Sequence, residues 1–467
     1  MTSTMGTTLA KVTISTPKRG IDVALPEDVT VAELLPYILR HAGDDAADAG
    51  ERHGGWALRR PTGQRLDPRQ TLGAQEIRDG EVLHLVPGQS EWPEIEYDDL
   101  VETIASGARR NGRGWGRAAT RRCGLVVGGS VLLSGTLITL LFRGPWLAPG
   151  LIMLAAAVVL TALGIVVARA VPDARGGALF AGCGLPYAFL GGLLITAPAH
   201  VGLLAFASPQ LLVGTIALLV FGIAGYVGVA AESRVFVAAI SIGLLGTLGA
   251  GLGGWLGADP AAAVVLTVGI ALLPGYPLLA IRLGRLPLPE LPQRAADLLT
   301  DDKPTAPTST VFDAARRADE VLTGLLLGLA VVAVCCAPPL IANGGAARLT
   351  ILVLGSLALL LRSRLFVVPR QRIPLLVGGL LTAAGFAGQL IAGFETILAL
   401  ALSLLALGLI ALLIAAAGVV YTRKNPSPYL GRIADWTDVV AILALIPYAA
   451  YITGFFAYVQ GLMASIG

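Results

Sequence analysis

The stretch ARRNGRGWGRAATRRCGLVVGGSVLLSGTLITLLF, from Ala108 to Phe142, joins a basic segment directly to an apolar one. Six arginines precede Cys123, and the 19 residues from Gly124 to Phe142 carry no charge. An uncharged run of this length can cross a bilayer as an α-helix. Cations crowded at one end of the first span favour retention of that end in the cytoplasm. The stretch therefore predicts a membrane protein with a cytoplasmic N-terminus.

The composition of the whole chain supports this prediction. Hydrophobic residues make up 55% of the 467 residues and charged residues 14%, whereas about 25% of a soluble globular domain is charged. The chain is therefore expected to be a polytopic α-helical membrane protein in contact with lipid. The net charge of +3 is explained by cations that set membrane orientation, so we expect no nucleic-acid partner.

The first 87 residues are polar and mixed in composition, unlike the rest of the chain. Alternating apolar residues on both sides of a turn at residues 17–20 predict a β-hairpin. A capping box formed by Thr30 and Glu33 predicts the start of an amphipathic helix. Further strands are predicted at Trp56 to Arg59 and at Val82 to Pro87. These elements define a small α+β domain.

The order of these elements resembles ubiquitin. The stretch from Thr71-Leu72 through Ile77 to Leu83-His84-Leu85-Val86 has the residues of ubiquitin's last third at the same spacing. The resemblance implies an α+β ubiquitin-like (β-grasp) cytoplasmic domain over residues 1–87. No diglycine tail follows, so we expect a fused docking domain that is not conjugated to other proteins.

The predicted docking surface lies on the outer face of this domain and just beyond it. With Leu83 and Leu85 directed into the core, the neighbouring side chains on the closing strand should face outward. The acidic segment that follows the domain adds an aromatic residue. The candidate residues are Arg59, His84, Val86 and Trp92.

Hydrophobic runs after the basic segment predict about eleven transmembrane helices. We expect a linker over residues 88–123, acidic and then basic, six spans over 124–283, a cytoplasmic Pro-rich loop over 284–320 and five spans over 321–467. The last span is predicted at Val439 to Met463. Of 24 lysines and arginines after residue 108, this topology places only Arg143 and Arg348 outside. The C-terminus is then predicted to lie outside.

The sequence lacks the common signatures of catalytic sites. It has no phosphate-binding loop, no His-Glu-x-x-His and no Cys-x-x-Cys motif. We therefore predict that the chain is not an enzyme and expect no catalytic residue, metal or cofactor site. A secondary solute transporter with an accessory cytoplasmic domain is the alternative. It is disfavoured because no paired ionisable residues are predicted at mid-membrane depth.

Small residues are frequent in the predicted spans. Gly249 and Gly253 form a Gly-x-x-x-Gly motif, which allows close approach of helix backbones. We therefore name Gly249 and Gly253 as candidate helix-packing residues, either within the bundle or at a subunit interface.

A ubiquitin-like domain followed by about eleven spans resembles the EccD family of actinobacterial type VII (ESX) secretion systems. The resemblance implies a structural subunit of the inner (plasma) membrane, present as two copies per protomer that form a homodimer within a larger membrane complex and enclose a membrane cavity. It also implies assembly with the EccB, EccC and EccE proteins, where EccC is the FtsK-type ATPase.

Overall fold

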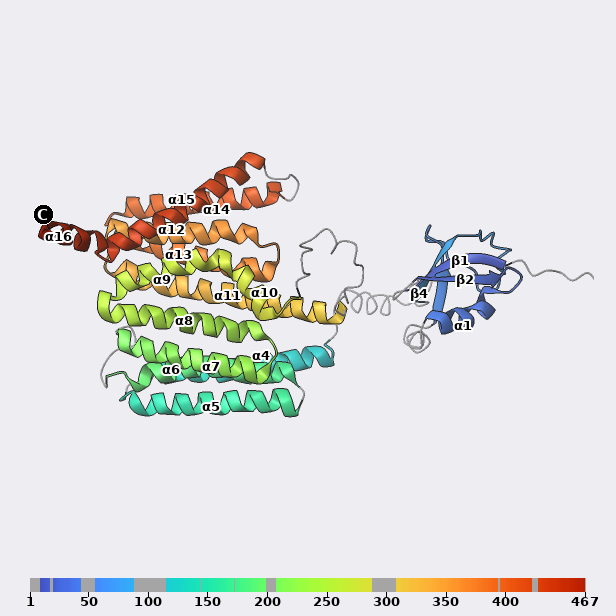
Figure 1. The fold of residues 1–467 in the computed structure, drawn as a ribbon, viewed down its shortest axis with the longest axis horizontal. Helices are drawn as coiled ribbons and strands as arrows, with labels where there is room; N and C mark the ends of the chain where they lie inside the picture. Colours follow the sequence, from blue (N-terminus) through green and yellow to red (C-terminus); the bar gives the residue numbers. More distant parts are fainter. Residues whose placement is uncertain are drawn as a thin grey trace, which may run out of the picture. The chain divides into compact units, whose positions relative to one another are not determined.

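The computed structural model describes residues 9–16, 20–42, 55–87, 115–142, 144–171, 173–198, 207–287, 308–393, 395–421 and 427–466. These residues belong to two compact units, Met1–Trp115 and Gly116–Gly467. Each unit is described separately below (Figure 1).

The N-terminal unit is a four-stranded sheet with one helix. Strands β1 (Leu9–Ser15) and β2 (Gly20–Pro26) form an antiparallel hairpin, and helix α1 (Val31–Ala42) follows. Strand β3 (Trp56–Arg59) pairs with β4 (Val82–Pro87), which runs parallel to β1. The order β2-β1-β4-β3 places the last strand in the middle of the sheet, as in a β-grasp fold.

The core of this unit follows from the alternation of apolar residues along the strands. Ile14, Leu83 and Leu85 on the central strands are at most 3% exposed, and they pack with Leu34 and Ile38 of α1. The inward direction predicted for Leu83 and Leu85 is confirmed.

The C-terminal unit is a helical bundle (Figure 1). Eleven of its helical segments are long and apolar enough to cross a membrane among the described residues, so the predicted count is confirmed. Helix α9, the short 3₁₀ turn η2 and helix α10 together make one of these spans, Ala258–Gly284. The helices are α4 (Arg117–Leu140), α5 (Leu147–Ala170), α6 (Ala174–Ile195), α7 (Ser208–Val229), α8 (Ser233–Leu256), α9 (Ala258–Leu272), η2 (Leu273–Gly275), α10 (Tyr276–Gly284), α11 (Thr308–Ala342), α12 (Ala346–Arg362), α13 (Pro369–Ala392), α14 (Ile397–Tyr421), α15 (Pro428–Ile452) and α16 (Phe455–Ile466).

Two predicted boundaries differ from the structure. Residues 308–320, assigned to the Pro-rich loop 284–320, form the first turns of α11. They are helical because this segment is rich in alanine and packs on α10, where a Cβ on Gly284 would lie 2.7 Å from the Cβ of Ala318. The last span begins at Pro428 and ends at Ile452 instead of running from Val439 to Met463. Gly454, with φ +75°, separates α15 from α16.

The first half of the bundle contains a close helix pair. On α5, small residues recur every seven positions at Gly150, Ala157 and Gly164, and on α6 the same spacing gives Gly177, Gly184 and Gly191. A Cβ on Gly164 would lie 2.6 Å from the Gly177 carbonyl oxygen, and one on Gly191 would lie 3.1 Å from the Gly150 carbonyl oxygen. The antiparallel helices α5 and α6 therefore touch backbone to backbone along their length.

Candidate functional site

The predicted docking residues of the ubiquitin-like unit lie on one face of its sheet. Arg59 of β3 pairs in register with His84 of β4, and Ala57 pairs with Val86. Because the intervening Leu58 and Leu85 enter the core, Arg59, His84 and Val86 share the opposite face. All three are half-buried, although they were expected to be exposed. Trp92 lies outside the described residues.

At one edge of this face, Arg60 contacts the loop before β4. It was not among the residues predicted from the sequence. Its guanidinium donates to the carbonyl oxygens of Gln75 at 2.5 Å and Glu76 at 3.2 Å. The Nε atom also lies 3.1 Å from the Glu81 carboxylate. Arg60 thus connects the end of β3 to the loop before β4 through charge-assisted hydrogen bonds.

The candidate packing glycines of α8 lie against other helices of the same chain. A Cβ on Gly249 would meet the Val265 side chain of α9 at 3.0 Å, and one on Gly253 would meet the Ser208 hydroxyl of α7 at 2.7 Å. These contacts are with side chains, whereas the contacts between α5 and α6 involve backbone atoms. The described structure thus uses both glycines for packing within the bundle.

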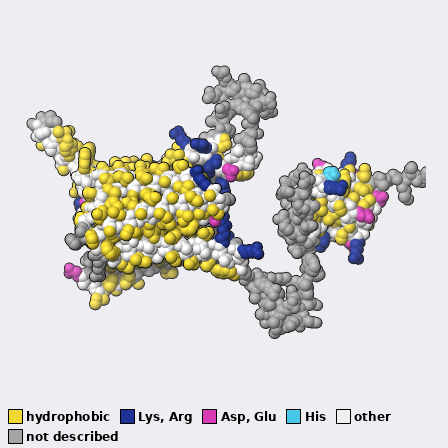
Figure 2. Space-filling view, turned by 90° about the horizontal axis from the view of Figure 1, so that it is seen from below, with side chains coloured by type: hydrophobic (Ala, Val, Ile, Leu, Met, Phe, Trp, Pro, Cys, Tyr) yellow, Lys and Arg dark blue, Asp and Glu magenta, His cyan; other side chains and the backbone are white. Residues whose placement is uncertain are grey.

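Arginines gather at one end of the bundle, whose flanks are hydrophobic (Figure 2). This is the end at which α4 begins and α5 ends, and we call it the basic end. There, Arg121 donates to Asp173 at 2.6 Å, and Asp173 caps α6 by accepting from the Gly176 N–H at 3.0 Å. The Gly176 N–H, with help from the Arg121 guanidinium, holds the pKa of Asp173 below its usual value.

Two acidic residues of α11 join the halves of the bundle at the basic end. The Glu320 carboxylate accepts from the Ser233 N–H at 3.0 Å and from the Ser233 hydroxyl at 2.6 Å, at the start of α8. The Asp319 carboxylate accepts from the Gln371 side chain of α13 at 2.5 Å. Helix α11 is thereby bonded to one helix from the first six spans and one from the last five.

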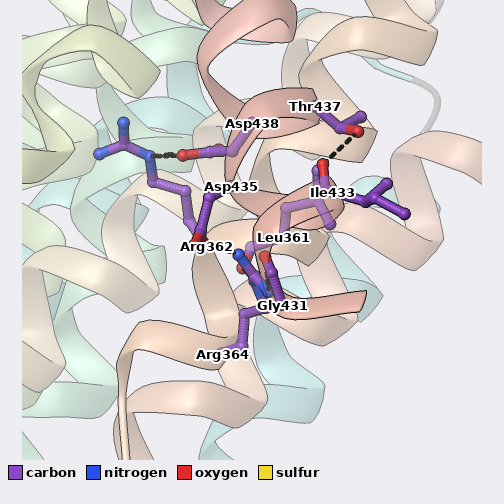
Figure 3. Close-up of polar contacts among 8 residues, drawn as sticks. All are labelled: Leu361, Arg362, Arg364, Gly431, Ile433, Asp435, Thr437 and Asp438. Atoms are coloured by element: carbon purple, nitrogen blue, oxygen red, sulfur yellow. Dashed lines mark hydrogen bonds and ion pairs between the residues drawn. The ribbon is translucent and has the colours of Figure 1, made fainter. Parts of the chain in front are cut away.

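A second pair of contacts joins the end of α12 and the 3₁₀ turn after it (Ser363–Leu365) to α15 at the same end (Figure 3). The Nε atom of Arg362 lies 3.1 Å from the Asp438 carboxylate, and the two side chains are 13% and 14% exposed. Arg364 pairs with Asp435, whose side chain is 68% exposed, and also donates to the Gly431 carbonyl oxygen. Neither pair was predicted from the sequence, although the spacing of Asp435 and Asp438 places them on one face of a helix.

One polar cluster lies at the opposite end of the bundle. Asp259 of α9 is 8% exposed. Its carboxylate accepts from Arg348 Nε at 2.5 Å and from the Asn343 amide at 3.1 Å. These contacts join the ends of α9, α11 and α12.

The polar clusters of the bundle connect helices to one another through ion pairs and hydrogen bonds. Each acid described above is bonded to an arginine, an amide or a hydroxyl, so none is poised as a free general base. Within the described residues, no group of three or more His, Cys, Asp or Glu side chains could hold a metal ion.

The comparisons with known proteins agree with this architecture. The family model for the EccD-like transmembrane domain matches residues 120–462. The model for protein YukD of the WXG100 protein secretion system (Wss) matches residues 9–85. The ESX-4 secretion system protein eccD4 of Mycobacterium tuberculosis is 26% identical over 479 residues, covering 97% of both chains.

Two solved structures share the fold. Protomer 1 of the ESX-3 core complex matches with a TM-score of 0.60 and 19% identity, covering 96% of this chain and 100% of that chain. The MycP5-free ESX-5 inner membrane complex (State II) matches with a TM-score of 0.55 and 20% identity, covering 89% of this chain and 100% of that chain.

Fold and comparisons together define the class as a polytopic helical membrane protein with an N-terminal ubiquitin-like domain. The family model covers more than half of the sequence. The chain belongs to the EccD-like transmembrane domain family.

Proposed function

We propose that this chain is a structural subunit of a type VII (ESX) protein secretion complex in the inner membrane. The observation that carries the proposal is the succession of a YukD-like domain and an EccD-like membrane domain in one chain. The relative eccD4 aligns over both parts. The subunit supplies a fixed membrane scaffold and leaves energy conversion to another protein.

Complex membership is tested by purifying the chain with an affinity tag from its native membrane in a mild detergent. We expect it to emerge in a large particle with EccB, EccC and EccE proteins, including the FtsK-type ATPase. Recovery of the tagged chain without other subunits would support a solute transporter and contradict the proposal.

The proposed orientation places the basic end in the cytoplasm. Arg121, Arg169, Arg234, Arg362 and Arg370 all lie at this end of the helices, as expected for loops that are not translocated. A Cys-less chain carrying Ser309→Cys should resist an impermeant thiol reagent in intact cells, whereas Ala346→Cys should react. Labelling of the cysteine at position 309 would reverse the orientation.

We also propose that the sheet face formed by Arg59, His84 and Val86 docks a cytoplasmic partner, the ATPase subunit. A face that combines a cation, an imidazole and an apolar side chain suits a modest, partly polar interface. The rigid edge at Arg60 supports this role because a fixed surface loses less entropy on binding.

The docking face is tested by changing Arg59→Glu and Val86→Asp together. The variant should insert in the membrane and retain its own fold, but it should release the ATPase from the purified complex and stop secretion. The matched control on α1, Tyr37→Asp with Arg40→Glu, changes exposed residues on the other side of the domain. Retention of the ATPase at the wild-type ratio by the sheet-face variant would refute the docking role.

A further inference from the structure

An apolar groove of about 300 Å³ runs between α11 and α13. Leu327, Val331 and Cys335 line it on α11, and Ile373, Val377 and Leu381 line it on α13. Each set extends over nine residues, or about 12 Å of helix. The groove begins within one turn of the start of α13, so it opens to the membrane in the leaflet at the basic end.

The floor of the groove is narrow because the two helices nearly touch beneath it. A Cβ on Gly378 would lie 2.8 Å from the Cβ of Ala330 and 3.0 Å from its Cα. An α-helix with its side chains is about 10 Å wide, too wide to enter a crevice between two helices packed this closely. A single hydrocarbon chain has the right shape and polarity.

A cation stands at the basic end of this groove. Arg370 precedes Ile373, Pro374 and Val377 by three, four and seven residues, so it lies on the groove face of α13. Its side chain is exposed, and no hydrogen bond or ion pair to it is present among the described residues. Arg372 is also exposed, but it lies about 200° further round the helix.

Two acidic groups of α11 at the basic end already have partners. Asp319 of α11 accepts from Gln371, and Glu320 accepts from Ser233. Because these carboxylates are occupied, the Arg370 guanidinium is available to bind an anion at the membrane surface. Basic sites between transmembrane helices at the cytoplasmic surface recognise anionic lipid headgroups.

We infer that the groove between α11 and α13 binds an anionic phospholipid from the leaflet at the basic end. One acyl chain occupies the groove, and Arg370 contacts the phosphate of the headgroup. The bound lipid fills a surface that the bundle itself leaves open, so it would act as a specific structural component of the subunit.

The test uses the full-length chain in vesicles of phosphatidylcholine that contain a photoreactive lipid with a diazirine on its acyl chain. The photoreactive lipid is either phosphatidylglycerol or phosphatidylcholine, and the cross-linked peptides are identified by mass spectrometry. We expect the anionic probe to label the groove segments of α11 and α13 preferentially. Arg370→Gln should weaken this labelling about fivefold, the loss of one surface cation's attraction to anionic lipid, whereas Arg372→Gln should leave it unchanged.

A second variant tests the groove independently of the charge. Val331→Trp with Val377→Trp should fill the groove and abolish its labelling, and Val159→Trp at an exposed site on α5 should have no effect. Equal labelling by both probes, or wild-type labelling of Arg370→Gln, would overturn the proposal. Formation of a disulfide between Cys335 residues of two chains would also overturn it, because a second copy would then occupy the groove.

Discussion

Helices α6 and α14 differ in a way that shows how this bundle is assembled. By mean hydropathy, α14 is the most apolar of the eleven spans, yet none of its described residues is buried. Helix α6 is far less apolar, but half of its 18-residue apolar stretch is buried. In a membrane, apolar character alone does not drive helices together, because lipid is equally apolar. The positions of small residues decide which helices pack.

The surroundings of the glycines explain why α6 is buried and α14 is not. A Cβ on Gly177 of α6 would lie 2.5 Å from the Gly164 carbonyl oxygen. A Cβ on Gly408 or Gly418 of α14 would meet nothing described within 4 Å. Glycine on α6 is thus a backbone contact site, whereas glycine on α14 faces the surroundings of the chain.

The largest expected effect comes from blocking the contact between α5 and α6. Gly164→Leu and Gly177→Leu should each destabilise the bundle by about 3 kcal/mol, because the new side chains meet backbone atoms that cannot move aside. The double variant should fail to accumulate in the membrane. Thermal unfolding in detergent and membrane abundance measure the effect, and wild-type stability would show that the two helices do not touch there.

A smaller loss of stability is expected when the polar contacts between α12 and α15 are removed. Asp438→Ala should cost about 2 kcal/mol because it leaves the nearly buried Arg362 without its partner. Asp435→Ala removes the more exposed pair with Arg364 and should cost less than about 1 kcal/mol.

A double variant, Arg362→Leu with Asp438→Leu, separates the pair from the helix packing around it. It should recover part of the stability lost in Asp438→Ala, since no unpaired charge remains. Equal unfolding temperatures for Asp438→Ala and Asp435→Ala would contradict the difference in burial.

Changing Asp173 to Asn should lower the stability by about 0.5 kcal/mol in a pH-dependent way, because asparagine still caps α6 but loses the negative charge at the helix N-terminus. The pKa of Asp173 is lowered in the folded chain, so its charge stabilises the fold above the unfolded pKa of about 4. This contribution is lost as the pH falls through the lower folded pKa. Unfolding temperatures of both forms should therefore converge below about pH 4, and a constant gap from pH 7 to pH 3 would exclude this role.

The smallest change in stability is expected for a substitution on α14. Gly408→Leu adds a side chain where no described atom lies within 4 Å, so the isolated chain should unfold at the wild-type temperature. A loss of stability comparable with that of Gly164→Leu would mean that α14 packs as tightly as α6 does.

Much of the fold could be predicted because it depends on local patterns. Long uncharged runs predict the spans, and alternation predicts the sheet. The ends of α11 and α15 could not be placed, since the helical turns at 308–320 are polar and the break at Gly454 interrupts an apolar run without any charge. Tertiary packing and a left-handed backbone conformation decide these boundaries.

The polar contacts were harder to predict than the helices. Arg362 and Asp438 are 76 residues apart, and only the packing of α12 against α15 brings them together. The contact between α5 and α6 did have a sequence signal, the seven-residue spacing of small residues on both helices. A single Gly-x-x-x-Gly motif at Gly249 and Gly253 was a weaker guide, because it occurs on one helix and says nothing about its partner.

As a proposed structural subunit of a type VII secretion complex, this chain is expected to be present in two copies per protomer. Native mass spectrometry of the particle purified through a tag on this chain tests it most directly. We expect two copies of the chain for each FtsK-type ATPase, and loss of the ATPase alone in the variant with Arg59→Glu and Val86→Asp. A ratio of one to one would contradict the copy number, and a particle that contains only copies of this chain would contradict the proposed function.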